Sequence, residues 1–161
     1  MVSAIYPGSF DPVTLGHLDL VARALPLFGR LTVAVAVNRS KAPTFSPEER
    51  IAMMREVLPA DDRLQVTSFH GLVVDFCKQQ GITAILRGVR TVSDFEYEYQ
   101  MALTNRHLQP RIETVFVMPS LQYSYVSSSL IKEIVRNGGD ATSFVHPQVE
   151  RRLRERLGPK S

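Results

Sequence analysis

The chain has 161 residues, of which 44% are hydrophobic and 22% charged, and its formal net charge is +3. These values are ordinary for a globular domain and exclude a disordered or fibrous protein. The single cysteine, Cys77, excludes an internal disulfide and a cysteine-rich zinc site. The sequence shows neither a signal-peptide pattern nor an apolar run of membrane-spanning length, so we expect one soluble, cytoplasmic domain over residues 1–161.

The positive charge is concentrated at the carboxyl terminus. Residues 146–161 hold five basic and two acidic side chains, which accounts for the whole excess of the chain. A nucleic-acid-binding surface would spread its basic residues over the body of the domain. We therefore expect no nucleic-acid partner and no membrane partner. We interpret the basic helix at about 147–157 as a solvated face or a subunit contact, important for assembly or solubility.

Short β-favouring runs alternate with helical patterns along the chain. The β-favouring runs predict strands at 2–6, 31–37, 64–69, 83–86 and 113–118. The patterns between and after them predict helices at 16–28, 47–58, 72–80, 94–107, 128–137 and 147–157. Strands that alternate with helices favour a parallel sheet with right-handed crossovers. The predicted fold class is therefore α/β, with a doubly wound, five-stranded parallel sheet.

Two of the helix boundaries are marked by residues with clear positional preferences. Ser46 and Glu49 have the spacing of a capping box, and Pro47 suits the first helical position between them. The glycine pair at 138–139 predicts the end of the helix that precedes it.

Ligands of such sheets bind beyond the carboxyl ends of the strands, where the strand order reverses. The loop at 7–17, after the first predicted strand, has neither the dinucleotide-binding glycine spacing nor a Walker A sequence. Gly16 would let the backbone approach a ligand, and His17 would lie in the first turn of a helix, where free N–H groups favour an anion. His17 could donate a hydrogen bond to a phosphate oxygen; the alternative is a histidine that merely packs at a helix start.

The loops after the other strands add cations and hydroxyl groups. Lys41 follows the second strand, Arg87 and Arg90 flank a glycine at the end of the fourth, and the serines at 127–129 open the helix after the fifth. Arginine suits bidentate contact with phosphate, and serines at a helix start could hold one. Each feature also has an ordinary alternative: a solvated lysine, two surface ion pairs, and an N-cap serine.

The sequence lacks an obvious enzymatic nucleophile. It contains no HExxH, EF-hand or GxSxG motif, and Cys77 lies on an apolar helix face, where we interpret it as a core residue. Hydrogen-bond donors and cations without a nucleophile fit displacement at phosphorus by a substrate that is already anionic. Such a reaction needs alignment and charge neutralisation more than a general base.

The segment at 14–17, with the sequence TLGH, resembles the (H/T)xGH signature of nucleotidylyltransferases with class-I-synthetase-like folds. Across nearly its whole length the chain is similar to the bacterial phosphopantetheine adenylyltransferase family. The segments that carry this resemblance are 6–12 (YPGSFDP), 87–90 (RGVR), 94–98 (DFEYE) and 127–133 (SSSLIKE). The resemblance implies a Rossmann-like nucleotidylyltransferase fold with C-terminal helices.

The resemblance also implies an activity. Enzymes of this family transfer the adenylyl group of ATP to 4′-phosphopantetheine, giving 3′-dephospho-coenzyme A and pyrophosphate, the penultimate step of coenzyme A biosynthesis. The family resemblance implies Mg²⁺ as cofactor, a homohexamer, and inhibition by coenzyme A. Because no carboxylate pair stands out in the sequence, we expect Mg²⁺ to be held by ATP phosphates and water, without a protein metal ligand.

Site residues carry over from the family by position. His17 would stabilise the transition state. The residues implied to bind phosphopantetheine are Ser9, Lys41, Val73 and Arg87. The residues implied to bind ATP are Ser9, Phe10, His17, Gly88, Val89, Arg90, Glu98, Tyr123, Ser124, Tyr125, Val126, Ser127, Ser128 and Ser129.

The chain departs from the family pattern at Ser9, where the family often has threonine, and at Tyr125, where it commonly has phenylalanine. Neither change removes a group that the reaction needs. The nearest alternative is an adenylyltransferase for nicotinamide or nicotinate mononucleotide, but those enzymes usually carry an arginine where Lys132 stands. Cytidylyltransferases usually have an RTEGISTS-like string, which is missing here.

A nucleotide-sensing module without turnover is an alternative of a different class. Against it stands the number of cationic or donor side chains, since His17, Lys41, Arg87 and Arg90 exceed what simple retention of a nucleotide needs.

Overall fold

The computed structural model describes residues 1–37 and 42–159. It contains a five-stranded, all-parallel sheet with the strand order β3-β2-β1-β4-β5. The strands are β1 (Ser3–Gly8), β2 (Arg30–Ala36), β3 (Leu64–Phe69), β4 (Ala84–Gly88) and β5 (Glu113–Val117). This architecture confirms the predicted α/β class. The strand order reverses between β1 and β4, so the ligand-binding crevice expected for such a sheet lies there.

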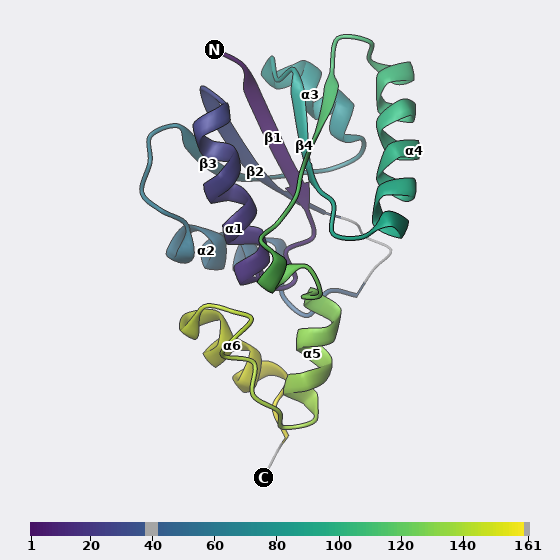
Figure 1. The fold of residues 1–161 in the computed structure, drawn as a ribbon. Coiled ribbons are helices and arrows are strands. Elements are labelled where there is room, and N and C mark those ends of the chain that lie inside the picture. Colours follow the sequence, from purple (N-terminus) through teal and green to yellow (C-terminus); the bar gives the residue numbers. More distant parts are fainter. Residues whose placement is uncertain (38–41, 160–161) are drawn as a thin grey trace.

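The helices cover both faces of the sheet and its carboxyl edge. They are α1 (Leu15–Ala24), α2 (Pro47–Val57), α3 (Val73–Gln80), α4 (Val92–Leu108), α5 (Ser128–Arg136) and α6 (Pro147–Leu157), with 3₁₀ turns η1 (Leu25–Leu27) and η2 (Leu121–Tyr123). Figure 1 shows α1 and α2 on one side of the sheet and α3 and α4 on the other, while α5 and α6 lie beyond the carboxyl end of β1. The predicted C-terminal helices are therefore present and close the lower end of the domain.

Successive side chains of β1 pack into two different hydrophobic clusters, one on each face of the sheet. Ala4 and Tyr6 belong to the larger cluster, under α1 and α2, and Ile5 belongs to the smaller cluster with Cys77 of α3. This alternation follows from the two-residue period of a strand covered on both faces. Cys77 is fully buried, and burial raises the pKa of its thiol to about 11, so the interpretation of Cys77 as a core residue is confirmed.

The first strand is longer at its carboxyl end than the predicted 2–6. Its pairing with β2 continues to Gly8, but its pairing with β4 ends at Ile5. Pro7 has no N–H to donate to β4, and its carbonyl accepts a hydrogen bond from the Arg87 side chain instead (2.8 Å). The sheet therefore opens between β1 and β4 at its carboxyl edge, where the site lies.

Two predicted helix boundaries are wrong for local reasons. The first helix ends at Ala24 and not at 28, because Pro26 removes a backbone donor and the chain continues as η1. Helix α4 begins two residues before the predicted 94, because the Thr91 hydroxyl caps it by accepting from the Asp94 N–H. The predicted capping box of α2 is confirmed.

Among the described residues, no helix is both long and apolar enough to cross a bilayer.

Candidate active site

A cavity of about 270 Å³ lies at the carboxyl edge of the sheet, where β1 and β4 separate. Its walls come from the loop after β1, the first turn of α1, the end of β4, the start of α4 and the segment before α5. Of the residues predicted to bind ATP, this first cavity brings together Ser9, Phe10, His17, Gly88, Arg90, Glu98, Tyr123, Val126 and Ser127.

A second cavity of about 740 Å³ adjoins the first. It extends between the ends of β1 and β2, the start of α3 and the inner side of α4. Of the residues predicted to bind phosphopantetheine, Ser9, Val73 and Arg87 line this second cavity, and Lys41 lies outside the described residues. The wall that both cavities share consists of Pro7, Gly8, Ser9, Arg87 and Glu98.

The remaining residues predicted to bind ATP line neither cavity. They are Val89, Ser124, Tyr125, Ser128 and Ser129. Tyr125 is 63% exposed and its ring meets Phe144 edge-on, so its additional hydroxyl does not face the first cavity. The Ser128 hydroxyl donates to the Pro12 carbonyl (2.8 Å), which ties α5 to the loop after β1.

His17 is fixed by the cap of its own helix. The Thr14 backbone N–H donates to Nδ1 of His17 (3.0 Å), and the His17 N–H in turn donates to the Thr14 hydroxyl. Because a backbone N–H can only donate, Nδ1 carries no proton, and in the neutral ring the proton is on Nε2. None of the described residues accepts a hydrogen bond from Nε2, and His17 lines the first cavity. The sequence TLGH therefore produces an oriented N–H donor.

The imidazole of His17 is uncharged at neutral pH. Burial, and then the positive charges of Arg90 and Arg87, lower the pKa of His17 to about 4. The Phe10 ring meets the imidazole edge-on, with 5.0 Å between the ring centroids. His17 thus packs at a helix start, as the ordinary alternative predicted, and it also presents an N–H donor to the first cavity; donation to a phosphate oxygen stays a prediction.

The loop between β1 and α1 is held in an unusual conformation. Phe10 has a φ of 47°, in the left-handed region that a bulky residue rarely adopts. Its ring lies over Gly8, where an added Cβ would approach the ring to 2.8 Å, so a larger residue at Gly8 would displace the Phe10 ring. Arg50, which is buried, donates to the Ser9 carbonyl (2.7 Å).

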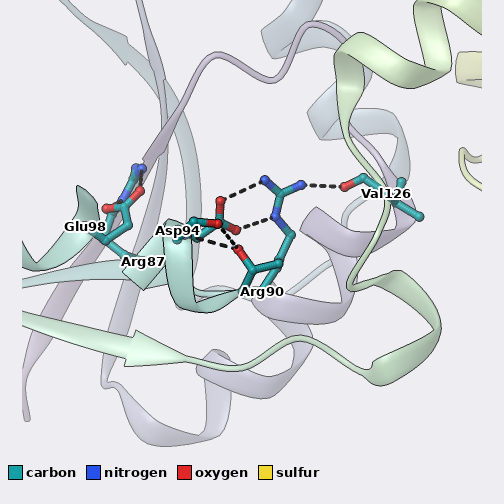
Figure 2. Close-up of polar contacts among 7 residues, drawn as sticks. Arg87, Arg90, Asp94, Glu98 and Val126 are labelled. Carbon is teal, nitrogen blue, oxygen red and sulfur yellow. Dashed lines mark hydrogen bonds and ion pairs between the residues drawn. The ribbon is translucent and has the colours of Figure 1, made fainter. Parts of the chain in front are cut away.

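Both arginines predicted to contact phosphate are held by carboxylates, as Figure 2 shows. Arg87 donates two hydrogen bonds to Glu98, at 2.7 and 2.5 Å. Burial by itself lowers the pKa of Arg87, but the hydrogen bonds and charge of Glu98 raise it overall. Arg90 pairs with Asp94 (2.9 Å) and donates to the Val126 carbonyl (2.9 Å).

These pairings weaken the argument that the site has more cationic side chains than simple retention of a nucleotide needs. The ion pairs that were the ordinary alternative for Arg87 and Arg90 are present, yet both side chains also line the first cavity. Glu98, which was predicted only as an ATP-binding residue, is the partner of Arg87. Protein groups therefore orient Arg87 and Arg90, and the paired carboxylates partly compensate the charge of these two side chains.

Asp11 is an important residue that the sequence reasoning missed. Its buried carboxylate accepts from the N–H groups of Thr44 and Phe45 (both 2.9 Å) and from Nζ of Lys132 (3.0 Å). Burial opposes ionisation, but these hydrogen bonds lower the pKa of Asp11, so the carboxylate is charged. The segment 6–12, which carries part of the family resemblance, contains Asp11 and was the available sequence signal for it. That segment does not reveal hydrogen-bond partners that lie 33 to 121 positions away.

The side chains of the site do not form a metal cage. Among residues 1–37 and 42–159, no group of three or more His, Cys, Asp or Glu side chains is placed to hold a metal ion. The two carboxylates that line the first cavity, Asp94 and Glu98, are already paired with arginines. This donor set fits a cation that is held mainly by its ligand's own oxygens and by water.

The sequence and the fold are both similar to those of known adenylyltransferases. A cytidylyltransferase-like family model matches residues 5–134. The phosphopantetheine adenylyltransferase of Thiobacillus denitrificans is 55% identical over 98% of this chain and 98% of its own length. The enzymes of the same name from Nitrosomonas eutropha and Opitutus terrae are 53% and 51% identical, over 97% and 99% of this chain and 95% and 100% of their own lengths.

Solved structures with this fold are more distant in sequence. Nicotinic acid mononucleotide adenylyltransferase from Plasmodium falciparum is 16% identical, with a TM-score of 0.64 and 92% of each chain covered. A bifunctional NMN adenylyltransferase/ADP ribose pyrophosphatase from Francisella tularensis is 15% identical, with a TM-score of 0.70 over 96% of this chain and 48% of that one. These likenesses concern the fold alone, whereas the full-length identity to curated relatives decides the family. The chain belongs to the phosphopantetheine adenylyltransferase family.

Proposed function

We propose that the protein transfers the adenylyl group of ATP to 4′-phosphopantetheine, giving 3′-dephospho-coenzyme A and pyrophosphate. Its membership of the family makes it an adenylyltransferase. The observation that carries the substrate assignment is the near-full-length identity to relatives named phosphopantetheine adenylyltransferase, and the pair of adjoining cavities with a common wall suits two substrates that must meet. ATP in the first cavity and the long pantetheine arm in the second would bring the acceptor phosphate next to the α-phosphate of ATP.

The reaction is a direct displacement. An oxygen of the acceptor phosphate attacks the α-phosphorus, a new P–O bond forms, and the bond to the oxygen that bridges to the β-phosphate breaks, so that pyrophosphate leaves with its electron pair. His17 donates from Nε2 to a non-bridging α-phosphate oxygen as negative charge develops there, and Arg87 and Arg90 neutralise phosphate charge. The acceptor is already anionic, so no side chain has to act as nucleophile.

Labelled ATP provides the test of direct displacement. With ATP labelled in the α-phosphate and no acceptor present, we expect no acid-stable AMP on the protein. Stoichiometric adenylyl-enzyme would contradict the mechanism.

The cofactor of the proposed reaction is Mg²⁺, bound to ATP. The partly compensated arginines and the paired carboxylates of the first cavity support a cation that enters with the triphosphate, and Mg²⁺ typically keeps much of its hydration. When bound, Mg²⁺ would neutralise part of the negative charge of the triphosphate. Addition of EDTA should abolish pyrophosphate release, and an excess of Mg²⁺ should restore it; unchanged turnover in EDTA would contradict this assignment.

The proposal also includes a cytoplasmic homohexamer that coenzyme A inhibits. Apolar side chains of α4 that line neither cavity support assembly, since Phe95, Tyr99 and Leu103 are 43–49% exposed and recur at four-residue spacing along one face of the helix. Coenzyme A contains the pantetheine arm and the adenosine of the product, so it can compete for both cavities. Light scattering should give six times the mass of the chain, and inhibition by coenzyme A should be competitive with phosphopantetheine.

A panel of acceptors tests the function itself. Purified protein with ATP and Mg²⁺ is given 4′-phosphopantetheine, nicotinamide mononucleotide, nicotinate mononucleotide or no acceptor, and released pyrophosphate is measured. We expect pyrophosphate release only in the sample that contains 4′-phosphopantetheine as acceptor. Release with a pyridine mononucleotide would assign the protein to the nearest alternative, and ATP binding without release in any arm would indicate a nucleotide-sensing module.

A further inference from the structure

A buried ion pair joins three segments around the first cavity without lining it. The side chains of Asp11 and Lys132 are 9% and 18% exposed, and Nζ of Lys132 lies 3.0 Å from Oδ2 of Asp11. The same carboxylate accepts from the N–H groups of Thr44 and Phe45, just before α2. One charged group therefore connects the loop after β1, the segment before α2, and α5.

The segments joined in this way carry the groups assigned to ATP. Asp11 directly follows Phe10, whose ring contacts the imidazole of His17. Lys132 lies one helical turn beyond Ser128, whose hydroxyl donates to the Pro12 carbonyl. Two adjacent loop residues, 11 and 12, are thus bound to two successive turns of α5. This double link ties the loop before α1 to α5, and the first turn of α1 and residues 126–127, just before α5, both line the first cavity.

Charge makes this link stronger than an ordinary loop contact. A carboxylate and an ammonium group that are both largely removed from water interact more strongly than exposed ions, and each depends on the other for compensation.

We propose that Asp11 and Lys132 are positioning residues for adenylyl transfer, because they fix the position of the His17 donor relative to the start of α5. The proposal rests on the proposed function. In the part of the chain that the structure describes, neither side chain lines the first or the second cavity, so we assign neither of them a contact with substrate. A displacement of about 1 Å at a reacting centre can reduce the rate by about 10²-fold. The pair should therefore affect kcat much more than the affinity for ATP.

Three variants and one matched control test the pair. Lys132→Met removes the cation and keeps most of the side-chain volume, Asp11→Asn removes the carboxylate charge and keeps an oxygen acceptor, and Lys132→Arg restores the charge. Asp61→Asn is the control, because Asp61 also accepts from a backbone N–H and a cationic side chain, both of Arg63, and lines neither cavity. For each protein we would measure kcat, the Kd for ATP without acceptor, the melting temperature, and the ¹⁵N signals of the His17 ring.

We expect Lys132→Met and Asp11→Asn to lower kcat by about 10²-fold while the Kd for ATP stays within about threefold, because the ATP-contacting groups remain present. Lys132→Arg should recover kcat to within about tenfold of the original protein. In Lys132→Met the ¹⁵N signals of the His17 ring should shift, because Phe10, which precedes Asp11, packs against the imidazole, although His17 touches neither substituted residue. The control should leave kcat, the Kd for ATP and the His17 signals unchanged.

Variants that melt at lower temperature but keep kcat and the His17 signals, measured well below their melting temperatures, would show that the pair is only structural and would overturn the proposal. The His17 signals require no substrate, so this outcome is independent of the acceptor panel. Failure of the original protein to use phosphopantetheine would refute the proposed function instead.

Discussion

The group that faces the first cavity from α1 is an uncharged donor. His17 receives a hydrogen bond at Nδ1 from the Thr14 N–H, and burial keeps its pKa near 4. In the proposed reaction, a neutral imidazole that is already oriented would stabilise charge as it develops on the α-phosphate, with no reorganisation at the moment of reaction. The proposed role of His17 therefore depends on the helix cap.

Replacing His17 tests this role directly. We expect His17→Ala to lower kcat by about 10²–10³-fold, because the interaction strengthens in the transition state, with the Kd for ATP changed only slightly. Steady-state kinetics and calorimetric titration of ATP provide the two quantities. His107→Ala, in an exposed residue of α4, is the control and should match the original protein. Unchanged kcat with weakened ATP binding would make His17 a positioning residue.

The protonation state of His17 is a second prediction at the scale of the residue. Nitrogen NMR of the labelled imidazole should show a neutral ring with the proton on Nε2 throughout the range above about pH 5, with titration near pH 4. Burial and the two nearby arginines cause this shift, since both disfavour the charged ring. A ring that titrates near 6.5, or one that carries its proton on Nδ1, would contradict the described hydrogen bonds.

At the scale of the element, α6 has two different faces. Its arginines are largely on the outside, as expected for a solvated helix, and Arg156 pairs with Glu49 of α2. Its apolar side chains Val149 and Leu153, in contrast, are fully buried in the larger hydrophobic cluster. The helix therefore contributes to the hydrophobic core. The interpretation from the sequence, a helix important for assembly or solubility, did not include this contribution.

A substitution in α6 measures this contribution. Leu153→Ala should lower the free energy of unfolding by about 2–4 kcal/mol, because it removes buried apolar contacts and leaves a cavity. Urea unfolding at fixed pH gives the value. Arg151→Ala, on the exposed side of the same helix, should change it by less than about 0.5 kcal/mol. Equal effects of the two substitutions would mean that α6 does not pack as described.

At the scale of the whole molecule, acid should weaken the fold in two steps. Between pH 6.5 and about 4 the unfolded chain protonates His17 while the folded protein does not, so the free energy of unfolding falls as pH falls. Asp19 accepts hydrogen bonds from the N–H and hydroxyl of Ser120 and from the Arg23 side chain. Burial opposes ionisation of Asp11 and Asp19, but their hydrogen bonds lower both pKa values, so the stability that they contribute is lost only below the ordinary aspartate pKa, as pH falls through their folded values.

The first step can be isolated with a variant. Urea unfolding of the original protein and of His17→Ala at pH 7 and pH 4.5 should show a smaller loss of stability in the variant, by up to about 3 kcal/mol. The other three histidines contribute equally to both proteins and cancel in the comparison. Identical pH dependence in the two proteins would show that His17 is protonated as easily in the folded state as in the unfolded one.

Features that depend on neighbouring residues were predictable from the sequence. The apolar run at 31–37 predicted a covered strand, the spacing of Ser46 and Glu49 predicted a capping box, and the segment TLGH placed His17 in the first turn of a helix. Each of these depends on interactions within a few residues or on the repeat of a single element. The alternation of such elements was enough for the fold class, and the ordered motifs were enough for the family.

Only the tertiary structure decided how the site residues are paired. Arg87 meets Pro7 across 80 positions and Lys132 meets Asp11 across 121, and no local pattern specifies contacts over such separations. The loop conformation that seats Phe10 over Gly8 and the common wall of the two cavities likewise arise only when the strands are assembled in the order β3-β2-β1-β4-β5. The sequence by itself therefore determined which elements form and which groups stand at their ends. Packing decided which charges neutralise one another, because side chains compensate charge through distance in space and not along the chain.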